Sequence, residues 1–455
     1  MKALRAWSAG LAILLATPAA AETLQEALSA AYQNNPDLRG ERARLRATDE
    51  NVPQALSGWR PTVSATGSVG ADRARTSLTN EQQLTPVIKQ LDVTQPLYRG
   101  GRTVAQTRQA ESQVMAGRAF LESVEQAVLL TTITAYMDVL REQANVALTT
   151  SNEQVLARQL EATRDRFEVG EVTRTDVAQA EARVSRAASD RVAAQGRLGV
   201  QRATYARVVG NLPGSLQPAP PLPPIPPTLQ DAIGIATTDN PDLEAAQYVE
   251  EAAQHGVRVA TGALLPSVNL VGRVLRSDEA TLEDIASRSD SLRAQVTIPL
   301  YQSGSVESQV RQAKEVANQR RIEIEQTRRA IVERTTQAWE DLQSSRSRIE
   351  TGRDQVRANE IALEGVRQEA SVGSRTTLDV LDAEQELLDS RVALVAAERD
   401  EYVSGFRLLS AIGALSADRL GLPVERYDPS RHYRQVRDKW WGWETPDDGE
   451  GASRR

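Results

Sequence analysis

The chain has 455 residues, and its 54 basic and 61 acidic side chains give a formal net charge of −7 at pH 7. This acidic balance argues against a nucleic-acid partner, which needs a basic surface. The chain has no cysteine and only two histidines, His255 and His432, so disulfides, thiol catalysis and the common zinc and haem sites are excluded. We therefore expect no metal and no cofactor.

Residues 1–21 have the pattern of a secretory signal peptide. Lys2 and Arg5 precede an apolar run over 11–16, and three alanines at 19–21 form a small-residue cleavage site. The run is too short to span a membrane, no cysteine follows it for lipid attachment, and no later run approaches the ~20 apolar residues of a membrane helix. The sequence predicts an exported protein, which could cross a membrane only as a closed β-barrel.

The rest of the chain repeats itself at an offset of 203 to 205 residues. Three pairs of segments carry the repeat: TLQEALSAAYQNNPDL at 23–38 with TLQDAIGIATTDNPDL at 228–243, TQPLYRGG at 94–101 with TIPLYQSG at 297–304, and VGEVTRTDVAQAEA at 169–182 with VGSRTTLDVLDAEQ at 372–385. A proline-rich linker at 217–227 lies between the copies. We predict two equivalent structural halves, at 22–216 and 228–415.

Each copy predicts the same order of elements. In the first copy we expect a helix over 23–57, strands within 59–98, a long helix over 102–169 and a return helix over 172–210. In the second copy we expect a helix over 228–262, strands within 264–301, a long helix over 304–372 and a return helix over 375–413. Residues 416–455 are expected to form a C-terminal equatorial segment and a disordered tail.

The strand prediction rests on alternation of apolar and polar residues. The apolar members are Val63, Ala65, Gly67 and Val69 in the first copy and Leu292, Ala294, Val296 and Ile298 in the second. Each chain thus supplies about four strands, whereas barrels close with about eight or more. Open edges are not tolerated in a bilayer, so the chain must oligomerise, and strand counting leaves two, three or more copies open.

The helices on both sides of Gly373 carry apolar residues at intervals of seven. They are Leu342, Ile349, Val356, Leu363 and Ala370 before the glycine, and Leu381, Leu388, Val395, Tyr402 and Leu409 after it. Strict sevens on both sides of a turn predict an antiparallel coiled-coil hairpin with its tip at Gly373.

The doubled repeat, TQPLYRGGR at 94–102 and the two VGxxTxxDV turns resemble the TolC-type outer-membrane efflux and secretion channels, from about residue 22 to about residue 420. The resemblance implies an α+β membrane protein. In it, a homotrimer builds a twelve-stranded β-barrel in outer-membrane lipid, with four strands per chain. A long periplasmic α-helical barrel of antiparallel coiled-coil hairpins continues the β-barrel.

The resemblance also implies a function and a set of partners. The protein would be an exit duct with a gated periplasmic tip that passes substrates unchanged, so it would not be an enzyme. It would dock onto a periplasmic adaptor (a membrane fusion protein) and an inner-membrane transporter of the RND or ABC type, in drug efflux or type I secretion.

Asp379 and Asp382 are the candidate pore residues. Spaced three apart, they share one face of a helix, and residue chemistry alone allows a solvated acidic face. The resemblance implies instead a constriction ring that favours cations, in which crowding of like charges would raise the carboxyl pKa values. The first copy has Asp176 and Gln179 at these positions, so the two halves are not equivalent here.

The resemblance also implies a gate and a docking surface at the hairpin tips. Arg375 would lock the closed tip by contacting Thr175 and Asp176 of a neighbouring hairpin. This chain has Ala370 where the family has a tyrosine that takes part in the lock. The residues implied to contact the adaptor are Val169, Gly170 and Glu171 at one tip and Val372, Gly373 and Ser374 at the other.

Two other functions would use parts of the same pattern. A periplasmic coiled-coil adaptor or scaffold without a membrane barrel also has a long hairpin, but such a protein normally has one hairpin and compact β domains. An enzyme would have to use Asp379 and Asp382 as acid and base, and no substrate motif supports that.

Overall fold

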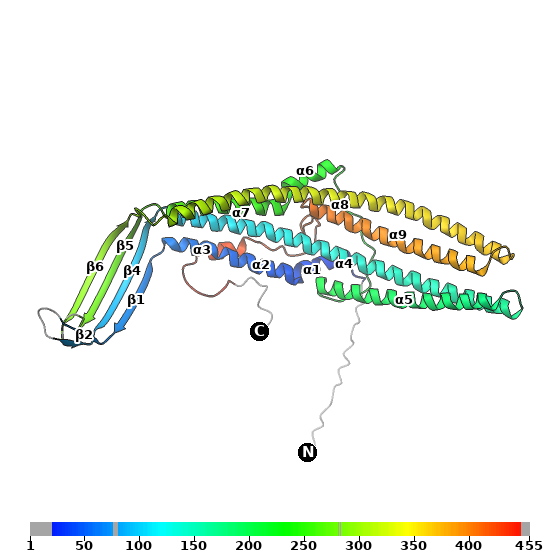
Figure 1. The fold of residues 1–455 in the computed structure, drawn as a ribbon, viewed down its shortest axis with the longest axis horizontal. Coiled ribbons are helices and arrows are strands. Elements are labelled where there is room, and N and C mark those ends of the chain that lie inside the picture. The colour runs from blue at the N-terminus through cyan, green and yellow to red at the C-terminus, as the bar shows by residue number, and fades with distance from the viewer. Residues whose placement is uncertain (1–20, 76–80, 281, 283, 447–455) are drawn as a thin grey trace, which may run out of the picture.

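The computed structural model of the protein describes residues 21–75, 81–280, 282 and 284–446. All but residue 21 of the expected signal peptide lies outside the described residues, as does the end of the expected C-terminal tail. The described chain forms an elongated body, with a β-sheet at one end and the tips of two helical hairpins at the other (Figure 1).

The two copies share one order of elements: short helices, two strands of the main sheet, a long helix and a return helix. The first copy has additional short helical elements and two additional short strands. The first copy comprises α1 (Leu24–Asn34), α2 (Pro36–Asp49), α3 (Asn51–Leu56), η1 (Ser57–Trp59), β1 (Thr62–Val69), β2 (Asp72–Ala74), β3 (Gln82–Leu84), β4 (Val87–Arg99), α4 (Arg102–Glu168) and α5 (Arg174–Val209). The second comprises α6 (Leu229–Asp239), α7 (Pro241–Gly262), β5 (Ser267–Asp278), β6 (Ala286–Thr297), α8 (Ser305–Ser371) and α9 (Thr377–Ala411). A short helix, α10 (Arg431–Val436), follows the second copy.

The long helices α4 and α8 have 67 residues each. At 1.5 Å per residue each extends about 100 Å. Helix α5 packs beside α4, and α9 packs beside α8, as two antiparallel hairpins (Figure 1). Among the described residues, no helix combines the length and the apolar character needed to cross a bilayer.

The expectation of single helices over 23–57 and 228–262 is wrong, because each is interrupted at an Asn-Pro step. Proline lacks the N–H that would continue the preceding helix but suits the first turn of a new one. Asn35 caps α2 by accepting a hydrogen bond from the Asp37 amide at 2.9 Å. Asn240 caps α7 through the Asp242 amide, also at 2.9 Å.

Both asparagines also tie the new helix to the end of a return helix. The Asn35 side-chain amide donates to the Val208 carbonyl and that of Asn240 donates to the Ala411 carbonyl, each at 2.9 Å. The NPD segment recognised in the repeat is therefore a structural joint, used once in each copy.

The sheet has the order β1-β4-β5-β6, with every neighbouring pair antiparallel. Strands β2 and β3 form a separate two-stranded ribbon in the loop between β1 and β4, which the sequence did not predict. Within the described chain β1 and β6 each have one unpaired edge, and β1 is exposed along its whole length.

The register places most apolar side chains on one face of the sheet and most polar side chains on the other, where Ile88, Val271 and Leu275 are the exceptions. One face carries Val63, Ala65, Leu91, Val93, Leu270, Val274, Leu292, Ala294 and Val296, with Lys89, Arg276, Arg288 and Asp290 toward its far end. The other face carries Ser64, Thr66, Gln90, Asp92, Arg273, Ser289, Ser291 and Arg293. On this polar face Arg273 pairs with Asp92 at 2.7 Å. One apolar and one polar face is the pattern of a sheet between lipid and water.

The predicted heptad seam of the second hairpin is confirmed. Eight of its ten residues are buried, and Val356 and Val395 are half-buried. The first hairpin uses smaller residues in its place, with Ala180, Ala187 and Ala194 buried at intervals of seven on α5. Small seam residues allow α4 and α5 to approach closely without a thick apolar layer.

The main apolar core lies at the waist, where the short helices meet both hairpins. Tyr136 and Tyr205 lie in it with ring centroids 6.4 Å apart, and Tyr402 and Phe406 lie 5.2 Å apart. The Tyr136 hydroxyl donates to the Gln217 carbonyl at 2.7 Å, and burial raises the pKa of that tyrosine to about 12. This core fixes the start of the proline-rich linker against the helices.

Candidate functional site

Each hairpin tip turns at a glycine in the left-handed region, with φ of 82° at Gly170 and 78° at Gly373. The Glu171 amide donates to the Arg166 carbonyl at 2.9 Å, and the Ser374 amide donates to the Glu369 carbonyl at 3.0 Å. These bonds close the ends of α4 and α8.

The six residues expected to contact an adaptor are all exposed at these tips. Val169 and Val372 are the apolar ones, with 73% and 79% of their surfaces exposed. Each tip therefore presents one apolar side chain beside a glycine turn.

The threonine and the aspartate of each VGxxTxxDV motif lie at the start of a return helix, α5 or α9. The Thr376 hydroxyl accepts a hydrogen bond from the Asp379 amide at 3.3 Å, and the Asp379 carboxylate accepts from the Thr376 amide at 2.8 Å. Thr173 and Asp176 form the same reciprocal capping box at the start of α5. The motif is thus a turn followed by a helix cap.

Capping lowers the pKa of the Asp379 carboxyl in the single chain. Hydrogen bonds from the backbone and side chain of Thr376 hold the pKa of its carboxyl below the ordinary value of 3.8. These donors stabilise the ionised form, whereas the expected rise in pKa concerns a ring of carboxylates from several chains and stays a prediction. The pKa of Asp176 is lowered by Thr173 in the same way.

Asp382 has a partner that the sequence did not predict. Its carboxylate pairs with the Arg183 guanidinium of α5 at 2.5 Å, across the two hairpins. The Arg183 side chain is 26% exposed and that of Asp382 is 55% exposed. Position 183 corresponds to Glu386 at the repeat offset, so a reversal of charge between the copies was the one signal in the sequence.

Arg375 bonds to its own hairpin in this chain. Its guanidinium Nε donates to Glu369 at 2.9 Å, and this bond raises the pKa of Arg375 above its usual range. Thr175 is exposed, and the Asp176 carboxylate is bonded to Thr173. A single chain therefore does not bring Arg375 together with Thr175 and Asp176.

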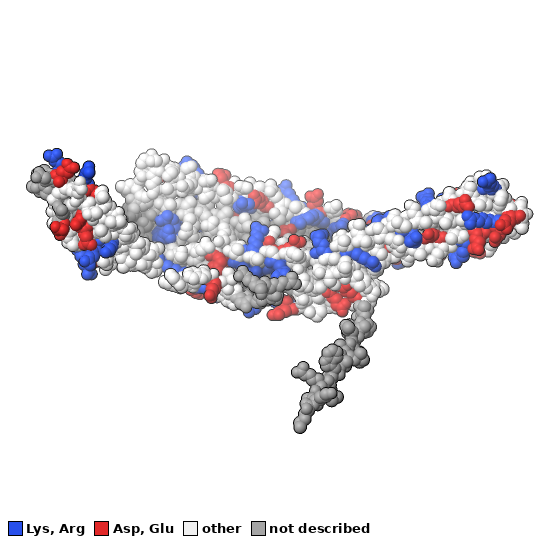
Figure 2. Space-filling model, turned by 90° about the horizontal axis from the view of Figure 1, so that it is seen from below, with Lys and Arg blue, Asp and Glu red and all other residues white. Residues whose placement is uncertain are grey.

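One ion pair recurs at both tips at the repeat offset. Arg164 pairs with Glu181 at 2.7 Å, and Arg367 pairs with Glu384, so each joins the two arms of one hairpin. The carboxylate of Glu384 is only 10% exposed. Figure 2 shows acidic and basic side chains gathered together at this end of the molecule.

Aromatic residues surround the junction between the sheet and the helices. Trp59 is 40% exposed, Tyr98 42% and Tyr301 81%. The backbone there is tightly packed, because a Cβ on Gly100 (φ of 63°) would lie 2.2 Å from the Gly262 carbonyl oxygen. Exposed aromatic rings at this level are typical of the girdle where a membrane barrel meets water.

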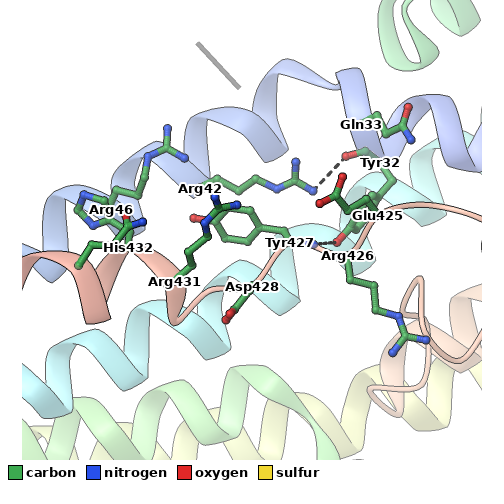
Figure 3. Close-up of a pocket in the computed structure, with 11 residues that line it drawn as sticks. Tyr32, Gln33, Arg42, Arg46, Glu425, Arg426, Tyr427, Asp428, Arg431 and His432 are labelled. Atoms are coloured by element: carbon green, nitrogen blue, oxygen red, sulfur yellow. Dashed lines mark hydrogen bonds between the residues drawn. The ribbon is translucent and has the colours of Figure 1, made fainter. Parts of the chain in front are cut away.

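A cleft of about 590 Å³ lies at the waist, between α1, α2 and the C-terminal segment (Figure 3). The Arg42 guanidinium lies between the rings of Tyr32 and Tyr427, 4.8 and 4.9 Å from their centroids. Beside the cleft, His432 pairs with the buried Asp49 at 3.1 Å, and burial raises the pKa of that carboxyl. These contacts hold residues 427–432 along α2.

These features together define a class of protein. An amphipathic sheet bordered by exposed aromatic residues continues into two long hairpins whose tips carry charged residues, which is the architecture of a channel of the cell envelope. The chain matches the outer membrane efflux protein family over two segments, residues 27–211 and 232–414. The double match coincides with the internal repeat, and the chain belongs to this family.

Two relatives and one solved structure show the extent of the likeness. The chain is 39% identical to the outer membrane efflux protein BepC of Brucella suis biovar 1 (strain 1330), over 96% of this chain and 95% of BepC. It is 27% identical to the outer membrane protein TolC of Vibrio cholerae serotype O1, over 87% of this chain and 92% of TolC. The CmeC outer membrane channel of Campylobacter jejuni superposes with a TM-score of 0.77 at 16% identity, covering 91% of this chain and 89% of CmeC.

The family assignment confirms the predicted fold class and localisation. The protein is an outer-membrane channel protein with a large periplasmic helical part. The members that it resembles are channels, and the alternative of a periplasmic adaptor without a membrane domain is not supported.

Proposed function

We propose that three copies of this chain close one twelve-stranded barrel in the outer membrane. Each sheet has an apolar face for lipid, a polar face for the lumen and, within the described chain, an unpaired edge on β1 and on β6. Unpaired strand edges are not tolerated in hydrocarbon, so β1 of one copy pairs with β6 of the next. The open amphipathic sheet is the observation that carries this proposal.

The four helical arms of each chain then form the periplasmic tube, through which substrates pass without chemical change. The exposed tips, with Val169, Gly170 and Glu171 on one hairpin and Val372, Gly373 and Ser374 on the other, receive a periplasmic adaptor. An inner-membrane transporter of the RND or ABC type supplies the substrate. The family description and the name of the BepC relative favour efflux over type I secretion as the route.

Asp379 and Asp382 line the constriction near the closed end of this tube. Asp379 carries a negative charge at neutral pH, and its helix cap lowers the pKa of this carboxyl further. Asp382 is partly neutralised by Arg183. The constriction of the trimer thus carries three Asp379 carboxylates and three Asp382 carboxylates paired with Arg183, and it favours cations.

Arg375 holds the tip closed in the trimer. Glu369 positions its guanidinium at the outer end of the hairpin, and Thr175 and Asp176 of a neighbouring hairpin are its proposed partners. Because Ala370 stands where the family pattern has a tyrosine, the lock is weaker or uses different contacts in this chain.

Planar-bilayer recording of the purified full-length protein tests the proposal. We expect small currents that select cations, and weaker selectivity when Asp379 and Asp382 are both replaced by Ala. Selectivity unchanged in that double variant would remove both carboxylates from the constriction. A protein that inserts without conducting would refute the channel itself.

A further inference from the structure

The C-terminal segment does not end at the waist but runs back toward the membrane. Tyr427 contacts α1, where its amide donates to the Tyr32 hydroxyl at 3.2 Å, and His432 contacts the end of α2 at Asp49. Farther along, the Arg60 guanidinium donates to the Lys439 carbonyl at 2.8 Å. Arg60 lies two residues before β1, so the segment reaches the junction between helices and sheet.

At this junction the chain forms a small closed loop, residues 439–444, which we call the tryptophan loop. The Lys439 ammonium donates to the Glu444 carbonyl at 2.6 Å and closes it. Gly442 turns the chain with a φ of 109°, a conformation that other residues rarely adopt. The Arg60 guanidinium lies 4.9 Å from the ring of Trp440 and fixes the base of the loop.

The loop presents three tryptophans to its surroundings. Trp440 is 69% exposed, Trp441 is 88% exposed and Trp443 is 91% exposed. Together they expose roughly 600 Å² of mostly apolar surface, as large as the biggest apolar patch of a typical soluble monomer. An exposed apolar surface of this size, concentrated in one short loop, indicates a binding partner.

The position of the loop identifies the chemistry of that partner. Trp59, Tyr98 and Tyr301 are exposed at the same junction, where a membrane barrel typically carries an aromatic girdle. Tryptophan favours the headgroup layer of a bilayer, where the ring lies among apolar groups and the indole N–H reaches polar ones. Because the helices lie in the periplasm, this layer belongs to the periplasmic leaflet.

We propose that the tryptophan loop is a membrane-interface anchor that inserts Trp440, Trp441 and Trp443 into the headgroup layer of the periplasmic leaflet. The tryptophan loop adds aromatic residues to the girdle of the barrel, although the loop itself is not part of a barrel strand. The segment at 425–439 acts as a strap between this anchor and the waist. The inference rests on the membrane position of the proposed barrel, which conductance measures independently.

Tryptophan fluorescence in lipid nanodiscs tests the anchor. In the full-length protein, Trp59→Phe and Trp339→Phe leave the three loop tryptophans as the only ones beyond the expected signal peptide. Bromine on the acyl chains quenches only indoles that touch lipid. We expect loss of most of the fluorescence with bromine near the headgroup, and a smaller loss with bromine near the methyl end.

A matched control keeps Trp339 and replaces Trp59 and the three loop tryptophans by Phe. Trp339 packs against the core at the waist, so its fluorescence should be the same in both lipids. Equal loop fluorescence in brominated and ordinary lipid would overturn the anchor and would point to burial against a protein surface. Single-channel current from the same preparation shows that the barrel is intact, so a failed anchor is distinguishable from a failed channel.

Discussion

Replacing Arg183 by Gln should make the channel more cation-selective, because the substitution removes the partner of Asp382 without touching Asp382 itself. The two groups lie 2.5 Å apart and come from different hairpins. Gln keeps much of the length and the hydrogen-bonding capacity of the arginine but not its charge. In a trimer, the substitution leaves three Asp382 carboxylates at the constriction without their ion-pair partner.

The size of the effect follows from Coulomb's law. At about 8 Å and the dielectric constant of water, each uncovered carboxylate stabilises a monovalent cation by ~0.5 kcal/mol. Three act together for ~1.5 kcal/mol, which is about a tenfold gain in the preference for cations over neutral species. Both side chains are partly exposed, so the lost ion pair should change the free energy of unfolding by less than ~1 kcal/mol.

The assay is the reversal potential in planar bilayers under a salt gradient. Arg329→Gln is the matched control, since it also uncovers a carboxylate, that of Glu325 at 2.9 Å, but on an exposed stretch of α8. The double variant Arg183→Gln/Asp382→Asn should return toward the wild-type selectivity. Equal selectivity in wild type and Arg183→Gln would refute the argument that Arg183 sets the charge of the constriction.

Three further outcomes follow from the structure. The lowered pKa of Asp379 predicts selectivity that stays constant from about pH 7 to about pH 5. The charge of Asp379 and the stability that it adds to the helix cap are complete above the ordinary pKa of 3.8, and both are lost as the pH falls through the lower folded-state pKa. A decline in selectivity near pH 6 would therefore contradict the cap. Asn35→Ala should cost ~1–3 kcal/mol in urea unfolding, because the cap and the bond to Val208 are lost together, whereas Asn35→Ser should retain part of the cap. Arg375→Ala should enlarge the basal conductance and Glu369→Gln should do so to a lesser degree; no change in either would place the gate elsewhere.

Much of the fold could be predicted because its signals are local. The absence of proline over long stretches predicted α4 and α8, and strict sevens predicted the seam of the second hairpin. The breaks at Asn35 and Asn240 were also visible in the sequence as Asn-Pro steps. The prediction of a single helix was wrong there because apolar residues continue at helical spacing across each joint.

The rest depends on contacts between distant parts of the chain. Arg183 and Asp382 are 199 residues apart, and only the folded chain shows that α5 and α9 approach each other there. The cap formed by Thr376 and Asp379 is local, yet its effect on the carboxyl pKa depends on hydrogen-bond geometry. The tryptophan loop was visible as three tryptophans, but its place beside Arg60 comes from packing along α2 and α3.

Cysteine cross-linking between β1 and β6 tests the central claim most directly, because the chain contains no cysteine of its own. Ser64→Cys would be combined in turn with Ser289→Cys, Ser291→Cys and Gln295→Cys, all on the polar face. Within one chain β1 and β6 are separated by β4 and β5, so they lie about 14 Å apart, beyond the ~7 Å limit for a disulfide. We predict that at least one pair links chains under oxidising conditions, up to three chains and no more. Linkage that stops at two chains, continues beyond three or fails for every register would contradict a barrel closed by three copies.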